Sequence, residues 1–192
     1  MKKIFIFIIS FYVYFPFLFG AETIVFVRHA EKPEGGLGQI TCQGLNRALR
    51  LPNVLEKKFG KPSAIFTSNP AEQKADSGVL YSYVRPLATI EPTAVRFGLP
   101  IYDKYGFKDV SAIVGALSDE KYKNSTIFVA WEHHLLVEIV KTLLSADKSI
   151  MVPKWDDRDF DSIYVVEIDR DKHTYKLRVD KQGLNGLPTE CP

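Results

Sequence analysis

Several features that indicate other classes of protein are missing from this chain. Its 192 residues contain no internal repeat, no low-complexity stretch and no linker long enough to separate two domains. The composition is 46% hydrophobic and 25% charged, which is ordinary for one globular domain. We therefore expect a single domain, over residues 22–192. Residues 1–21 differ from it in composition and are expected to form a leader.

An excess of charge of one sign is also missing. The chain has 25 basic and 23 acidic residues, and two of the basic ones, Lys2 and Lys3, belong to the expected leader. The rest of the chain is therefore balanced. Nucleic-acid binders usually carry a basic surplus, so we expect no nucleic-acid partner. A balanced chain can still contain a local cationic pocket.

Only one long apolar run is present, over residues 4–19, directly after Lys2 and Lys3. It contains Pro16 and is shorter than the roughly 20 residues of a membrane span. A basic head, an apolar run and small residues behind it are typical of a secretory signal peptide. The sequence predicts a periplasmic or secreted protein that has no membrane partner after signal removal. An uncleaved anchor is the less favoured alternative.

The chain has only two cysteines, Cys42 and Cys191. In an exported protein an even number of cysteines favours a disulfide, which here would close a loop of about 150 residues. The alternative is two separate thiols. We predict the bridge, because the polar tail around Cys191 has little else to hold it.

Short apolar runs alternate with amphipathic segments, which is typical of α/β proteins. We predict strands at 23–27, 64–67, 126–130, 162–168 and 175–179, and helices at 44–58, 86–97, 109–117 and 133–144. Residues 68–83 are polar and irregular, and a proline at position 52 predicts a kink or break in the first helix. The expected fold is a three-layer α/β/α sandwich with a mostly parallel central sheet and a C-terminal antiparallel hairpin.

Two of the four histidines follow predicted strands. Arg28 and His29 end the first apolar run, and His133 comes three positions after the end of the run at 126–130. Open α/β sheets bind ligands outside the carboxyl ends of their strands, so both histidines are expected at one crevice. An arginine offers a planar set of donors for phosphate oxygens. A histidine offers a nucleophile or proton carrier near neutral pH.

In these and further motifs the chain resembles the histidine phosphatase superfamily, the phosphoglycerate mutase-like proteins. The matching motifs follow the family's order: Val27-Arg28-His29-Ala30-Glu31, Ile40-Thr41-Cys42-Gln43-Gly44, Phe66-Thr67-Ser68-Asn69-Pro70, Arg85-Pro86-Leu87-Ala88-Thr89-Ile90-Glu91-Pro92, Gly98-Leu99-Pro100 and Val129-Ala130-Trp131-Glu132-His133. They extend over roughly residues 23–145. Together they imply a phosphatase fold and a phosphohistidine mechanism.

The resemblance assigns catalytic roles to four of these side chains. His29 would attack phosphorus, Arg28 and Arg85 would neutralise the phosphate, and His133 would donate from the opposite side. The set implies an acid-phosphatase-like phosphomonoesterase that uses neither metal nor other cofactor.

Three further residues are expected to serve substrate binding. Glu31 would orient the donors of the phosphate site, and Ser68 occupies the serine position of the family's Ser-Pro motif. His134 stands where the family often has glycine, so it would shape the pocket.

The second cation departs from the family's spacing. Glu72 stands where many members have their second arginine, and the next arginine is Arg85. We interpret residues 71–84 as an insertion. Arg85 is preferred because the residues behind it keep the family's spacing, and Lys74 within the insertion is the rival.

The general acid has no family motif in this chain. Glu132 is the first candidate because it lies beside His133, and Asp109 and Asp103 are alternatives. Such an acid needs a raised pKa to donate near neutrality. The other interpretation is that Glu132 orients a neighbouring arginine or histidine.

The sequence as a whole predicts an exported phosphomonoesterase for small phosphate esters, whose partners are a phosphorylated substrate or inorganic phosphate. The alternative is a catalytically weak or inactive phosphate-binding module on the same fold. A metal-dependent hydrolase built on Glu132, His133 and His134 is less favoured, because adjacent histidines at a helix start are not expected to share a face. The charged loop at 155–161 is interpreted as surface.

Overall fold

The computed structural model describes residues 21–192, so the predicted signal peptide lies outside the described residues except for Ala21. In chain order the elements are β1 (Glu22–Arg28), α1 (Cys42–Phe59), β2 (Ala64–Ser68), β3 (Gln73–Asp76), β4 (Val79–Ser82), α2 (Arg85–Phe97), β5 (Ile101–Tyr105), α3 (Val110–Leu117), a 3₁₀ turn (Glu120–Tyr122), β6 (Thr126–Trp131), α4 (His133–Leu143), β7 (Ser162–Asp169) and β8 (Thr174–Lys181). Among these helices, none combines the length and apolar character that a membrane crossing requires.

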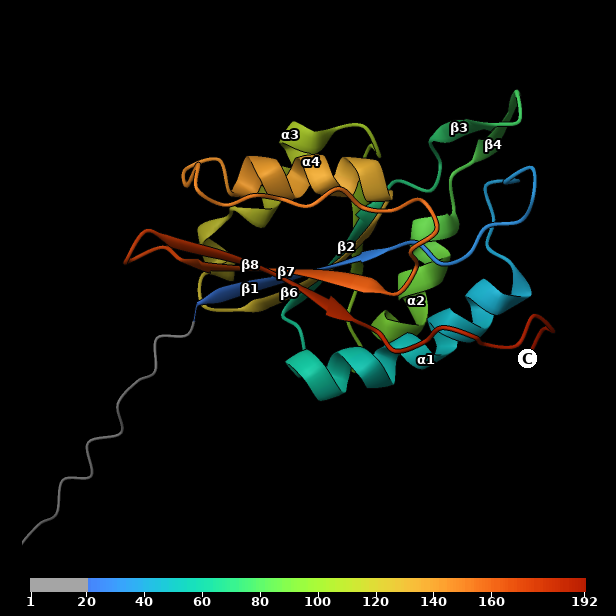
Figure 1. The fold of residues 1–192 in the computed structure, drawn as a ribbon, viewed down its shortest axis with the longest axis horizontal. Helices are drawn as coiled ribbons and strands as arrows, with labels where there is room; N and C mark the ends of the chain where they lie inside the picture. Colours follow the sequence, from blue (N-terminus) through green and yellow to red (C-terminus); the bar gives the residue numbers. More distant parts are fainter. Residues whose placement is uncertain (1–20) are drawn as a thin grey trace, which may run out of the picture.

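The central sheet has the strand order β5-β2-β6-β1-β7-β8 (Figure 1). Strands β5, β2, β6 and β1 run parallel, and β7 and β8 are added as an antiparallel hairpin. The predicted fold class is therefore confirmed. The parallel arrangement brings the ends of β1 and β6 together, with Arg28 opposite Trp131.

Helices cover both faces of the sheet (Figure 1). Helices α1 and α2 pack on one face, where Leu51, Leu55 and Ile90 meet strand residues such as Val25 and Phe128. Helices α3 and α4 cover the other face and contribute to a larger apolar cluster. Because both faces are covered, β1 and β6 are buried along nearly their whole length, which explains their continuous apolar runs.

The first helix begins at a cap that the sequence signals. The Thr41 side chain accepts a hydrogen bond from the Gly44 backbone, as expected at a helix N-terminus. A Cβ on Gly44 would lie 2.8 Å from the Glu31 carbonyl oxygen, so a glycine lets the loop behind β1 pack closely on α1. The predicted break at Pro52 is wrong, because α1 continues through this residue.

Residues 71–84 are more regular than predicted. They contain the two-stranded hairpin β3–β4, which forms a sheet of its own and pairs with no strand of the central sheet. Strand β5 was also not predicted. It lies at the edge of the central sheet with most of its residues exposed, so its sequence lacks the apolar signature of the inner strands.

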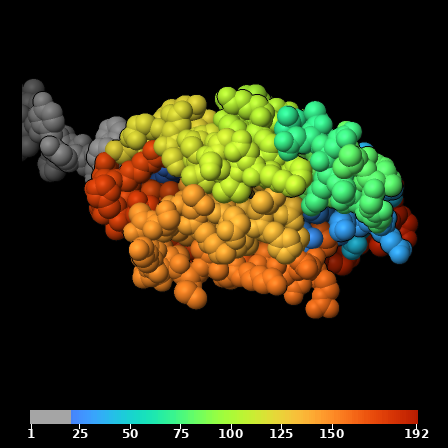
Figure 2. Space-filling model, turned by 90° about the horizontal axis from the view of Figure 1, so that it is seen from above, coloured from blue at the N-terminus to red at the C-terminus, as the bar shows by residue number. Residues whose placement is uncertain are grey.

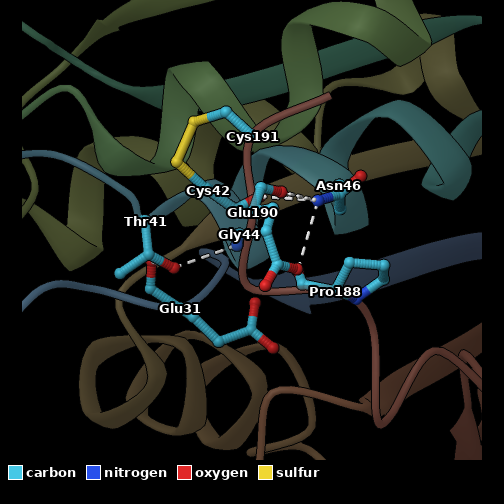
Figure 3. Close-up of a disulfide and its surroundings, with 8 residues drawn as sticks. All are labelled: Glu31, Thr41, Cys42, Gly44, Asn46, Pro188, Glu190 and Cys191. Atoms are coloured by element: carbon cyan, nitrogen blue, oxygen red, sulfur yellow. Dashed lines mark hydrogen bonds between the residues drawn. A yellow bond between two sulfur atoms is a disulfide. The ribbon is translucent and has the colours of Figure 1, made fainter.

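The predicted disulfide is present between Cys42 and Cys191, whose Cα atoms are 4.5 Å apart (Figure 3). Asn46, one turn into α1, donates hydrogen bonds to the carbonyls of Pro188 and Glu190. The covalent bond and these hydrogen bonds together fix the C-terminal tail against the first turns of α1.

Candidate functional site

A cavity of about 360 Å³ lies at the carboxyl ends of β1 and β6. Its lining contains both strand-end histidines and charges of both signs: Arg28, His29, Lys32, Lys74, Asp76, Arg85, Glu132, His133, His134 and Asp157. The space-filling view shows the hairpin region next to the blue loop that follows β1, at one end of the molecule (Figure 2). The structure thus brings six of the eight predicted site residues to one cavity.

His29 is 2% exposed and lies at the inner wall of this cavity. Its Nδ1 is 2.8 Å from the Ala30 carbonyl oxygen. A carbonyl can only accept, so Nδ1 carries the proton in the neutral ring and Nε2 keeps its lone pair. Burial lowers the pKa of His29 to about 3, and the nearby Arg28 and Arg85 act in the same direction. The ring is therefore neutral near pH 7 and suited to nucleophilic attack.

Arg28 is fixed by the loop at 155–161. Its Nη1 donates to the carbonyls of Asp157 and Asp159 at 2.7 and 3.2 Å, and its guanidinium lies 4.0 Å from the ring centre of Phe160. Its Nε is buried and, among the described residues, has no hydrogen-bond partner. A buried donor without a partner is costly unless a ligand supplies the acceptor. The loop interpreted as surface therefore holds Arg28 and contributes Asp157 to the lining of the cavity.

Arg85 opens α2 and is 1% exposed. Both of its terminal nitrogens contact Asp76 of β3, at 2.8 and 3.1 Å, and Nη1 also donates to the Gly36 carbonyl. Burial alone would raise the pKa of Asp76, but the hydrogen bonds from Arg85 and Gly38 hold it below its usual value. Arg85 and Asp76 thus form a buried ion pair that docks the hairpin beside the cavity.

Lys74 reaches the same cavity from β3. Its Nζ lies 4.8 Å from the ring centre of Tyr83 and 5.8 Å from that of Phe107. Burial lowers the pKa of Lys74, while the Glu132 carboxylate opposes this shift. The two rivals for the second cation, Lys74 and Arg85, therefore both line the cavity.

His133 stands at the first position of α4 between two carboxylates. Its Nδ1 is 2.9 Å from Glu132 Oε1, and its Nε2 is 2.7 Å from Asp157 Oδ1. Nδ1 is buried and, within residues 21–192, forms no hydrogen bond, so its contact with Glu132 is one of proximity only. A proton on Nε2 would lie towards Asp157 and the cavity, where an acceptor could take it.

Glu132 does not have the environment that a general acid requires. Burial raises its pKa, but the contact with His133 and the hydrogen bond from the Leu135 backbone outweigh this effect and bring the pKa to about 2. The carboxyl is thus ionised near neutrality, and the expectation of a raised pKa is wrong. Glu132 instead caps α4 and contacts His133, in agreement with the alternative interpretation of this residue. Asp103 and Asp109 are not among the residues lining the cavity.

His134 differs from its expected orientation. Its ring centre is 3.9 Å from that of His133, and its Nε2 is 3.2 Å from the same Asp157 oxygen. The two adjacent histidines therefore do converge. Ligand atoms of Glu132, His133 and His134 lie within 4.8 Å of one another, a grouping that could hold a metal ion.

Two predicted binding residues lie away from the cavity lining. The Glu31 carboxylate pairs with the buried Arg47 of α1 at 2.7 Å, so it joins the loop after β1 to that helix. Ser68 is buried at the end of β2, and its Oγ has no hydrogen-bond partner within residues 21–192.

Sequence reasoning missed three lining residues, Lys32, Asp76 and Asp157. Lys32 lies three positions after His29, and this closeness was the available signal. Asp76 and Asp157 belong to the insertion and to the charged loop, and nothing local in the sequence distinguishes them from surface carboxylates.

The fold resembles that of several solved structures. A mycobacterial glucosyl-3-phosphoglycerate phosphatase matches with a TM-score of 0.53 and 14% identity, covering 84% of this chain and 98% of that one. A phosphoglycerate mutase from Plasmodium falciparum matches with a TM-score of 0.53 and 16% identity, covering 90% and 98%. A phosphoserine phosphatase variant from Entamoeba histolytica, in complex with phosphoserine, matches with a TM-score of 0.54 and 11% identity, covering 85% and 98%.

No family model and no curated protein matches the sequence. The structural likenesses show that the chain has the fold of the histidine phosphatase superfamily, the fold that the order of its motifs predicts.

Proposed function

We propose that the protein is an exported, metal-independent phosphomonoesterase that hydrolyses small phosphate esters through a phosphohistidine at His29. The observation that carries this proposal is the His29 ring. Its Nδ1 is hydrogen-bonded to the Ala30 carbonyl, and the ring faces a cavity that also contains His133 and arginine side chains. A neutral, oriented imidazole beside fixed cations is the arrangement that phosphoryl transfer requires.

In the first step the His29 Nε2 lone pair attacks phosphorus. A bond forms between Nε2 and phosphorus while the bond from phosphorus to the ester oxygen breaks. Arg28 Nε, with no partner among the described residues, donates to a phosphoryl oxygen, and Arg85 Nε, equally unpartnered, offers a second donor. The leaving oxygen takes the electron pair and a proton from His133, so the ester replaces Asp157 as the acceptor at that ring.

In the second step water attacks the phosphohistidine. His133, now neutral, removes a proton from this water as the new bond between oxygen and phosphorus forms. The bond from nitrogen to phosphorus breaks, and its electron pair returns to His29. Inorganic phosphate leaves, and both rings are restored. Glu132, ionised with a pKa of about 2, stabilises the imidazolium form of His133 during the cycle.

The proposal is tested by detecting acid-labile phosphate on the protein and phosphate release from an aryl phosphate. We expect His29→Ala to remove both signals and orthovanadate to inhibit the wild-type protein. His173→Asn is the matched control, because His173 lies exposed in the β7–β8 turn. Exhaustive chelation should leave activity intact. Full turnover by His29→Ala would disprove the phosphohistidine, and loss of activity on chelation would instead favour a metal at Glu132, His133 and His134.

A phosphate-binding module without turnover is the second candidate function. It is favoured by the carboxylates around His133: Glu132 is ionised, and Asp157 lies 2.7 Å from the nitrogen that would donate the proton. Binding of inorganic phosphate without any phosphoenzyme after mixing with a panel of esters would support this function and exclude the esterase.

Export is supported by the leader-like residues 1–21 and by the Cys42–Cys191 bridge, since disulfides persist in oxidising compartments. We propose that the functional domain begins near residue 22 after removal of the leader. Mass spectrometry of the protein isolated from the periplasm or medium would test this. A mass that includes the first 21 residues would favour the uncleaved anchor.

A further inference from the structure

We propose that Lys74, from the inserted hairpin, supplies the second positive charge for the substrate phosphate, in place of Arg85. This inference rests on the phosphatase function proposed above and names a residue that sets phosphate affinity within it. Its basis is the different pairing of the two cations: Arg85 is neutralised within the protein, whereas Lys74 is not.

Arg85 has little left to offer a ligand. Asp76 takes both of its terminal nitrogens and the Gly36 carbonyl takes a further hydrogen bond, with all three partners buried or backbone atoms. Breaking such a buried pair leaves an uncompensated carboxylate, which typically costs several kcal/mol. Arg85 therefore keeps its ion pair when phosphate binds and contributes one hydrogen bond from Nε, with its charge already balanced.

Lys74 is in the opposite situation. It lines the cavity and is half-buried, and within residues 21–192 its ammonium forms no ion pair or hydrogen bond. Instead Nζ lies over the faces of Tyr83 and Phe107. Aromatic faces attract a cation without consuming its hydrogens, so all three N–H donors stay available. The Tyr83 ring also packs edge-on against His29, with ring centres 6.1 Å apart, which places Lys74 near the nucleophile.

The charges of the cavity lead to the same conclusion. Its lining has four cations, Arg28, Lys32, Lys74 and Arg85, and three carboxylates, Asp76, Glu132 and Asp157. A phosphate dianion requires a net positive hollow. Lys32 is exposed and therefore strongly screened, and Arg85 is paired with Asp76. Lys74 therefore joins Arg28 as a lining cation whose charge stays available to a phosphate.

The experiment compares Lys74→Met, Lys74→Arg and Lys104→Met with the wild-type protein. Methionine keeps the length and the aromatic packing but removes the charge, and arginine restores the charge. Lys104 is a matched control, because it is exposed on β5 with its Nζ 5.4 Å from the ring centre of Tyr105 and does not line the cavity. Calorimetry measures the dissociation constant of inorganic phosphate, and an aryl phosphate assay measures kcat/KM and vanadate inhibition.

We expect Lys74→Met to weaken phosphate and vanadate binding by about 10- to 100-fold, the usual range for losing a charged hydrogen bond. Lys74→Arg should keep most of the affinity, and Lys104→Met should equal the wild type. Unchanged phosphate affinity in Lys74→Met would overturn the proposal. Thermal unfolding checks that each variant is folded, and Lys74→Gln replaces the methionine variant if that protein does not fold.

The phosphate-binding measurement separates this inference from the esterase itself. A wild-type protein that binds phosphate through Lys74 but forms no phosphoenzyme would refute the esterase and support the role of Lys74. A protein that turns over esters with equal phosphate affinity in wild type and Lys74→Met would support the esterase and refute the role of Lys74.

Discussion

The buried ring of His29 makes the stability of the protein sensitive to acid. Its pKa is about 3 in the folded protein, where burial is the main cause, against about 6.5 in an unfolded chain. Between these values the unfolded chain binds a proton that the folded protein does not. The contribution of His29 to stability is therefore complete above pH 6.5 and decreases as the pH falls towards 3.

We expect the free energy of unfolding of the wild-type protein to fall more steeply below pH 6.5 than that of His29→Asn. The two slopes should differ by about 1.4 kcal/mol per pH unit, the effect of one proton. Urea unfolding followed at several pH values measures both slopes. His173→Asn, at an exposed position, should show the wild-type slope. Equal slopes for wild type and His29→Asn would contradict a neutral buried ring.

At the scale of single residues, the sequence indicates which side chains belong to the site better than it indicates what surrounds each of them. Arg28, His29 and His133 could be placed because each follows a run that is recognisable as a buried strand. The state of Glu132 could not be predicted, because it depends on the orientation of the His133 ring and on the backbone of α4. The ion-pair partner of Arg85 could not be predicted either, because Asp76 reaches Arg85 only when the hairpin folds back onto the loop after β1.

Among the elements, the hairpin β3–β4 packs closely against the glycine-rich loop that follows β1. A Cβ on Gly36 would collide with the Asp76 carboxylate, whereas a Cβ on Gly35 would meet nothing within 4 Å. Both glycines have left-handed backbones, with φ of +76° and +75°. Alanine substitutions at these two positions therefore separate two causes of lost stability. Both substitutions strain the backbone, but only the one at Gly36 also displaces the hairpin.

We expect Gly35→Ala to lower stability by about 1 kcal/mol, the usual penalty for a side chain in this conformation. Gly36→Ala should cost more and should also reduce kcat/KM at least tenfold, because Asp76 must move and Arg85 and Lys74 move with it. Thermal unfolding and the aryl phosphate assay measure the two effects. Similar activity in both variants would show that the hairpin does not position the site.

The spacing of apolar residues in the sequence predicts the helices and the inner strands of the central sheet, but it does not predict the exposed strands β3, β4 and β5. The segments at α1, α2, α3 and α4 have apolar faces that match the sheet. Pro52 lies within α1 without ending it, because packing of Leu51 and Leu55 on the sheet supports both sides of the missing hydrogen bond. Strands β3, β4 and β5 expose half or more of their side chains, so no apolar alternation marks them.

For the molecule as a whole, the Cys42–Cys191 bridge is the longest-range constraint, joining residues 149 positions apart. Closing so long a loop restricts the unfolded chain, and removing a native disulfide typically costs 2–5 kcal/mol. We expect the double variant Cys42→Ser/Cys191→Ser to lose about that much in its free energy of unfolding, measured in urea.

A reductant provides the control for this prediction. It should destabilise the wild-type protein by about the same amount and leave the double serine variant unchanged. A wild-type protein that is insensitive to reductant, with both thiols shown to be free by alkylation, would mean that the hydrogen bonds from Asn46 hold the tail without the bridge.

The topology was the most predictable property at this scale. Alternating strands and helices define a parallel sheet, and the final pair of strands joined by a short turn defines the antiparallel edge. The position of the loop at 155–161 beside the cavity could not be predicted, because its contacts with Arg28 join segments about 130 positions apart.

The independence of the β3–β4 sheet has a consequence for redesign. Lys74, Asp76 and the adjoining Tyr83 reach the cavity or its border from a short excursion that shares no ladder with the six main strands. Lengthening, shortening or replacing this excursion would leave the register of those strands untouched. The charge and shape of the cavity could therefore be changed by exchanging this excursion, while the scaffold that carries the two imidazoles stays the same.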